Sequence, residues 1–187
     1  MSKRFPVPEF DRDLYKNLPW TEPAALPPEA VSQLLTSVQK GDEKAIGGHP
    51  VAVSKEFASR FGFEMNGRTA LMCILPAKQV RMSGRSWAWP IQRALVTDSL
   101  DPERTTVLAD WTTPRPMNTR LGLDGGIVLP VGAVYVLCGH RYGDHWIANR
   151  MLVSAEGGEP VDGFSVLSAC DDRINDFHSC NLIFGWN

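Results

Sequence analysis

The feature that most constrains the fold is a series of short β-type runs that fills the chain from residue 125 onward. GGIVLPVGAVYVLCG and HWIANRMLV flank HRYGD, which predicts a β-hairpin with a polar tip, CGHRYGDHW, at residues 138–146. GFSVLSAC and CNLIFGW predict two more strands, and DDRINDFH between them predicts a helical turn. Short strands in close succession favour a mainly antiparallel sheet.

Two helices are expected before this sheet. LPPEAVSQLLTSVQKG has an apolar stripe at helical spacing, and VSKEFASRFG begins after a capping Ser54 and stops at Gly62. TALMCIL, residues 69–75, and RTTVLADW favour strands, and Pro90 could open a short helix over residues 91–96. GDEKAIGGHP reads as a loop. The fold class predicted from these elements is α+β, in which two helices precede a mainly antiparallel sheet.

Residues 1–27 are expected to form an extended arm, and residues 28–187 a single α+β domain. Five prolines in the arm, followed directly by Pro28, disfavour both helix and central strand. Large apolar side chains lie among these prolines, and their exposure to water would be unfavourable. We therefore expect the arm to lie on a surface, its own or a partner's, through the anchors Phe5, Phe10, Tyr15 and Trp20.

The net charge of −2 argues against a chain built as a whole for nucleic acid or an anionic membrane. The charge is uneven, because residues 60–120 sum to +4 and residues 121–187 to −5. This asymmetry suits a polar protein interface or head-to-tail self-association. No secretory leader and no membrane span is evident, so we expect a cytoplasmic protein with reduced thiols. Phosphate-loop, dinucleotide and nucleophile-elbow motifs are absent, and no cofactor is expected.

The hairpin tip contains the residue types of a cysteine-dependent enzyme. Cys138 would be the nucleophile, His140 or His145 the base, and Asp144 the group that orients the base. Cys73 is a weaker nucleophile, since it lies in an apolar run where burial would make it inert. A polar hairpin tip without chemistry is the favoured interpretation.

The same region contains a possible zinc site. Residues two apart on a strand share a face, so Cys138 and His140 form one pair, and His178 and Cys180 form another. Two such pairs on neighbouring strands could hold zinc tetrahedrally. The spacing differs from that of known structural sites, and buried cysteines acting as small apolar groups are the favoured interpretation.

The third group of residues lies in KQVRMSGRSWAWPIQR, residues 78–93, which contains no acidic residue. Its cations and indoles suit single-stranded nucleic acid or a nucleotide, or a protein contact, because Trp and Arg are the residues richest in interface hot spots. The protein contact is favoured. The residues concerned are Arg81, Arg85, Trp87, Trp89 and Arg93.

The sequence as a whole thus predicts a non-enzymatic protein-interaction protein: an assembly component, an inhibitor or immunity-type protein, or an accessory subunit. Its partner would be another protein or a second copy of this chain, held by the arm and the basic segment. The alternative is a small cysteine-dependent hydrolase or transferase with its site at residues 138–145. The third hypothesis is a nucleic-acid or nucleotide binder acting through residues 78–93. Whether the chain is an enzyme is left open.

Overall fold

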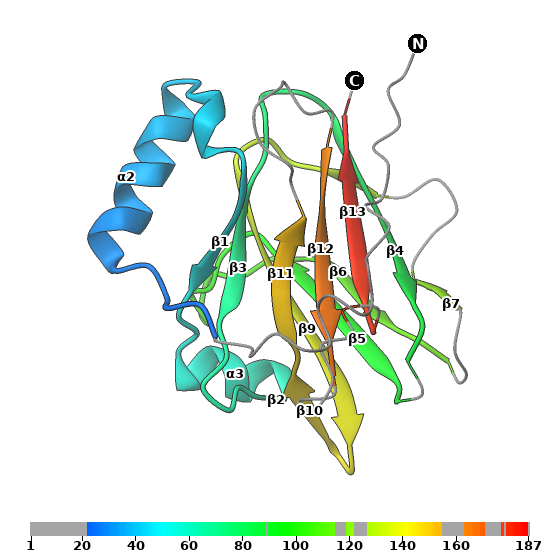
Figure 1. Ribbon diagram of the computed structural model, residues 1–187. Helices are drawn as coiled ribbons and strands as arrows, with labels where there is room; N and C mark the ends of the chain where they lie inside the picture. The colour runs from blue at the N-terminus through cyan, green and yellow to red at the C-terminus, as the bar shows by residue number, and fades with distance from the viewer. Residues whose placement is uncertain are drawn as a thin grey trace.

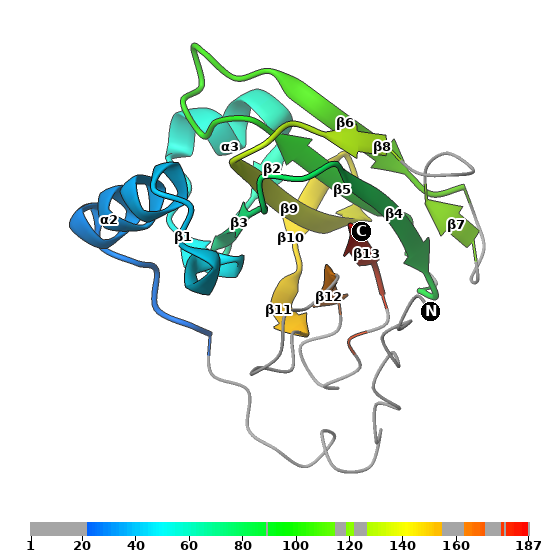
Figure 2. The same cartoon turned by 90° about the horizontal axis from the view of Figure 1, so that it is seen from above.

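The computed structural model describes residues 22–88, 90–114, 119–121, 127–154, 163–170, 177 and 179–186. Two β-sheets lie face to face, with helix α2 beside one edge of the sandwich and helix α3 below it (Figure 1). The view from above shows the two layers, with strands β5, β9 and β6 in one and β11, β12 and β13 in the other (Figure 2). The α+β class is confirmed. The strands form two sheets rather than the single sheet expected.

Both predicted helices are present. Helix α2, Pro28–Gln39, carries proline in its first turn, and Gly41 follows it with a φ of +76°. Helix α3, Lys55–Phe61, begins where the Ser54 hydroxyl accepts a hydrogen bond from the Phe57 amide, and it ends at Gly62 with a φ of +72°. The segment expected as a loop between them contains the short helix η1, Glu43–Ala45, and strand β1, Gly47–Val51.

The first sheet is built around β9, the longest of the described strands. One edge of β9 pairs with β3 and then with β10, and its other edge pairs with β5. All pairs in this sheet are antiparallel except β10 with β2. The strands are β1, β2 (Phe63–Glu64), β3 (Ala70–Ile74), β5 (Gln92–Thr97), β6 (Val107–Thr112), β9 (Ala133–Tyr142) and β10 (His145–Ala148).

The second sheet is antiparallel throughout, in the order β11-β12-β13-β4-β7, with β8 also paired to β4. Its strands are β4 (Val80–Ser86), β7 (Thr119–Leu121), β8 (Ile127–Leu129), β11 (Arg150–Ser154), β12 (Gly163–Ala169) and β13 (Asn181–Gly185). The segment after Pro90 forms β5 and not the short helix, because it is paired on both sides by β6 and β9.

The core lies between the sheets and is formed by side chains of alternate strand residues, which point inward. In β4, Val80 and Met82 are fully buried while Arg81 and Ser83 are exposed. The rings of Phe164 and Phe184, from adjacent strands of the second sheet, stack with centroids 4.8 Å apart. Each sheet therefore has one inner face against the core and one outer face.

The predicted hairpin is confirmed as β9 and β10, joined by Gly143 and Asp144. The positive φ of Gly143, +58°, occupies the first position of this two-residue turn, where glycine is favoured. After β10 the chain passes at once into β11 of the other sheet, and a single residue, Asn149, separates the two strands. Among the helices described here, none has the length and apolar character needed to cross a membrane.

Candidate functional site

Asn149 lies at the corner where the chain crosses from the first sheet to the second, and its side chain contacts both. It is 1% exposed. Its amide nitrogen donates to Gln92 Oε1 at 2.9 Å, in the first sheet, and to Ser168 Oγ at 3.2 Å, in the second. Its oxygen lies 2.8 Å from Nδ1 of His140. One side chain thus joins polar groups of the two sheets in a single buried network.

Two thiols meet beside this corner. Cys138 projects from the inner face of β9 and Cys180 immediately precedes β13, and both are fully buried. The neighbouring Cys138 thiol and burial together raise the pKa of Cys180 well above its usual range. Burial raises the pKa of Cys73 as well. A thiol of raised pKa is a poor nucleophile, because the thiolate is the reactive form.

The structure brings part of the predicted catalytic group together. Cys138 and His140 share a strand face, as expected, and the group that orients His140 is Asn149 instead of Asp144. Asp144 and His145 lie at the exposed hairpin tip, where His145 Nδ1 is 3.6 Å from a Glu64 carboxylate oxygen. A Cys–His–Asn arrangement could activate a thiol, yet this thiol has no exposed surface for a substrate to reach.

The predicted metal ligands converge only in part. Cys138 and Cys180 meet, although from facing sheets and not from neighbouring strands. Nδ1 of His140 is occupied by Asn149, and His178 lies outside the described residues. Within the described ranges, no three Cys, His, Asp or Glu side chains are arranged to hold a metal ion.

The basic segment is divided between the two sheets. Arg81 and Arg85 project from the outer face of β4 in the second sheet. The Arg85 guanidinium lies 5.9 Å from the ring centroid of Trp87, which is 37% exposed. Trp89 and the arm anchors Phe5, Phe10, Tyr15 and Trp20 lie outside the described residues.

Arg93 lies on the outer face of the first sheet, where its guanidinium contacts other residues of the fold. Its guanidinium forms two hydrogen bonds with Asp110, at 2.8 and 2.9 Å, and donates to the Phe61 carbonyl at 2.5 Å. It also lies over the rings of Phe63 and Trp146. A guanidinium with these partners ties α3 to the sheet and is poorly placed to act together with Arg81 and Arg85.

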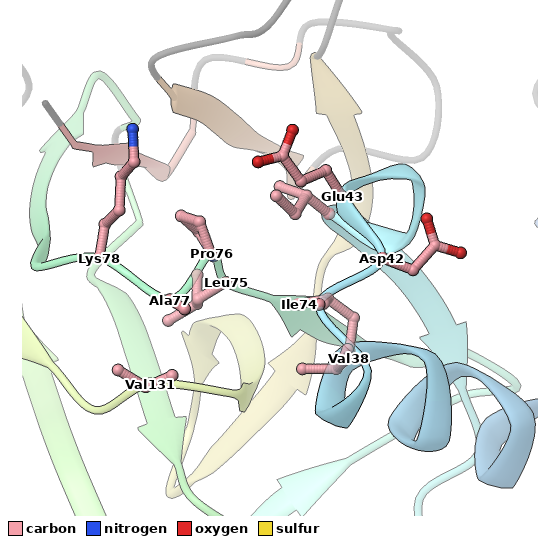
Figure 3. A pocket seen from close by; sticks show the side chains of 11 residues that line it. Val38, Asp42, Glu43, Ile74, Leu75, Pro76, Ala77, Lys78 and Val131 are labelled. Carbon is pink, nitrogen blue, oxygen red and sulfur yellow. The ribbon is translucent and has the colours of Figure 1, made fainter.

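A cavity of about 150 Å³ opens at the surface between the end of α2 and the loop that joins β3 to β4. Figure 3 shows Lys78 and Glu43 on opposite sides of its opening and the apolar side chains between them. Ile74 and Leu75, which are almost fully buried, contribute to its lining. The other lining residues are Val38, Gly41, Asp42, Ile46, Pro76, Ala77 and Val131.

Sequence reasoning missed Asn149, Gln92, Ser168 and the cavity. A single asparagine between two β-type runs, in HWIANRMLV, is the signal that could have marked Asn149 as a corner. The cavity has no sequence signal, because its walls come from segments that meet only in the folded chain. Comparisons with protein-family models, with curated proteins and with solved structures found no match for this chain.

Proposed function

We propose that this chain is a non-enzymatic protein-interaction protein that receives an apolar side chain of its partner in the cavity between α2 and the β3–β4 loop. The observation that carries the proposal is the size and lining of that cavity. Pockets for small-molecule substrates usually measure about 300–1,000 Å³. A cavity of about 150 Å³ has instead the size of a single ring or branched side chain.

The chemistry of the cavity supports the same function. Its lining is mainly apolar, with Val38, Ile74 and Val131 among its walls. Lys78 and Glu43 at the opening can pair with polar groups that surround an inserted side chain. A buried apolar anchor with a polar rim is the usual arrangement of an interface hot spot.

The cavity alone would bind weakly. Burial of one Leu or Phe side chain contributes about 1.5–3 kcal/mol, so a stable complex needs further contacts. The outer face of β4, with Arg81, Arg85 and the adjacent Trp87, supplies cationic and aromatic groups for an acidic partner surface. In the same proposal, the apolar anchors of the arm, residues 1–27, provide further contacts with the partner. The partner is another protein or a second copy of this chain.

The test uses two valines that are both exposed. Val131 lines the cavity, whereas Val107 lies on β6 away from it, and the two are 66% and 43% exposed. N-acetyl-leucine amide is titrated into the methyl-labelled full chain, with an expected dissociation constant on the order of millimolar. We expect shifts of the cavity methyl signals that Val131→Asp abolishes and Val107→Asp preserves.

The same two variants test protein binding directly. Proteins that co-purify with the wild-type chain are quantified by mass spectrometry, and self-association is followed by sedimentation velocity. Binding that disappears in Val131→Asp and persists in Val107→Asp supports the proposal. Absence of methyl shifts, together with binding that neither variant affects, counts against it.

A cysteine-dependent hydrolase or transferase is the second candidate. The 2.8 Å contact between His140 and Asn149, beside Cys138, is the observation that favours it. Complete burial of the Cys138 side chain opposes it, because a substrate could meet the sulfur only after the sheets separate. The two functions are distinguished by Cys138→Ala, which would abolish activity in the enzyme and leave partner binding intact in the interaction protein.

A further inference from the structure

Three of the four cysteines of the chain, Cys138, Cys170 and Cys180, lie near the corner at Asn149. The Cys138 thiol neighbours that of Cys180, whereas Cys73 lies on β3 opposite Val134, farther along β9. Cys180 interacts in turn with Cys170, which is the only one of the four that is partly exposed. None of the four is in a disulfide. This group of three therefore includes two buried thiols and one that is partly exposed.

Short hydrogen bonds hold the backbone on both sides of the central pair. The Asn149 amide donates to the Cys138 carbonyl at 2.8 Å, and the Ser168 hydroxyl donates to the Cys180 carbonyl at 2.7 Å. Asn149 and Ser168 are themselves joined at 3.2 Å. Three hydrogen bonds thus connect the backbones of the two cysteines from opposite sheets, so the fold fixes where the two residues lie relative to each other.

The partly exposed Cys170 is tied to the same segment. Its amide donates to Ser179 Oγ at 3.1 Å, and that hydroxyl lies 3.2 Å from the Cys170 sulfur. Ser179 directly precedes Cys180 in the chain. Ser179 therefore links the two sites: it is hydrogen-bonded to Cys170 and is the chain neighbour of Cys180.

We propose that Cys138 and Cys180 form a disulfide that joins the two sheets, and that Cys170 is the thiol through which a low-molecular-weight disulfide oxidises them. The Cys170 thiolate attacks the small disulfide and releases one small thiol. Cys180 then attacks the Cys170 sulfur and releases the second small thiol. Cys138 finally attacks the Cys180 sulfur, and Cys170 leaves as a thiolate and takes a proton. Two protein thiols are oxidised and one small disulfide is reduced to two thiols.

The environment of the thiols determines the rate and the consequence of this reaction. The raised pKa of Cys180 keeps its thiolate fraction small at neutral pH, so exchange in the native protein is slow and accelerates with alkalinity. The new bond closes a loop of about 40 residues and restricts the unfolded chain. An increase in melting temperature of about 10 °C is expected for a domain of this size.

The experiment exposes the full chain to glutathione disulfide at pH 8.5. Thiols are then blocked, and the disulfide is mapped by peptide mass spectrometry at successive times. We expect a Cys138–Cys180 linkage and the increase in melting temperature. Cys170→Ala should slow formation of the linkage about tenfold or more, whereas the matched control Cys73→Ala should leave its rate unchanged.

Two results would overturn the proposal. Glutathione bound to Cys170, with Cys138 and Cys180 still free after unfolding, would show that the buried pair does not close. A linkage that forms equally fast in Cys170→Ala would show that oxidation does not begin at Cys170. Circular dichroism of both variants before oxidation verifies that each is folded.

Discussion

Replacement of Asn149 by alanine tests whether the polar network at the corner holds the two sheets together. The change removes the hydrogen bonds of the side chain with Gln92, Ser168 and His140. Gln92 and Ser168 are both fully buried, so water cannot replace the missing partner. His140 is partly exposed, and its ring nitrogen can be hydrated.

The magnitude follows from these partners. Gln92 Oε1 is left without a donor inside the core, which costs about 2 kcal/mol. Ser168 loses one hydrogen bond but keeps its donation to the Cys180 carbonyl, which is a loss of about 1 kcal/mol. The partly exposed His140 adds little. We therefore expect Asn149→Ala to lower the free energy of unfolding by about 3 kcal/mol, and the melting temperature by about 6–12 °C.

Urea unfolding followed by tryptophan fluorescence measures this loss, with Gln39→Ala on the exposed side of α2 as the control. Asn149→Asp provides a second readout, because its carboxylate would face the Gln92 and Ser168 oxygens and favour the protonated form. This variant should gain stability as the pH falls, because a carboxyl of raised pKa takes up its proton more readily in the folded state. A loss below about 1 kcal/mol in Asn149→Ala would refute the reasoning.

Four further predictions concern other parts of the molecule. The pKa values of Cys73 and Cys180 are raised in the fold, so the unfolded state loses these protons first above about pH 9. Stability should therefore fall by about 1.4 kcal/mol per pH unit for each of these two thiols, and less steeply in Cys73→Ala. Gly139→Ala should destabilise the fold, since a methyl group there would lie 2.7 Å from the Phe63 ring, and calorimetry will measure the change. If the chain binds nucleic acid, fluorescence anisotropy of a labelled oligonucleotide should give a binding constant that falls steeply with salt concentration. This salt dependence should weaken when Arg81 and Arg85 are replaced by alanine. Absence of binding excludes that function. Cys138→Ala should keep the melting temperature within a few degrees, and an activity that survives in this variant excludes a thiol nucleophile.

Local signals predicted the helices and the hairpin well. Ser54 and Gly62 delimit α3 through contacts within the segment itself, so the sequence contains the information needed. Gly143 marks the hairpin turn for the same reason, because a positive φ favours glycine. The all-apolar run at residues 69–75 likewise corresponds to β3, which is buried along its whole length.

Non-local pairing accounts for what could not be predicted. The segment after Pro90 becomes β5 because β9 and β6 pair with it, and both follow it in the sequence. The division of the strands into two sheets places Arg85 and Arg93 on different outer faces, although they are close in sequence. Asn149 acquires its role from Gln92 and Ser168, which come from distant strands. No short stretch of the sequence contains these contacts, because the residues that form them are far apart in the chain.

The passage of the chain from β10 to β11 through one residue has a mechanical consequence. A one-residue connection is too short to adapt to a change in the angle between the two sheets. A rotation of one sheet must therefore strain the backbone at Asn149 or move the other sheet with it. Slow amide exchange should therefore report one common opening event for both layers, with no separate release of either. Any partner that tilts the strands at one end would transmit that motion to the far side of the molecule through this single link.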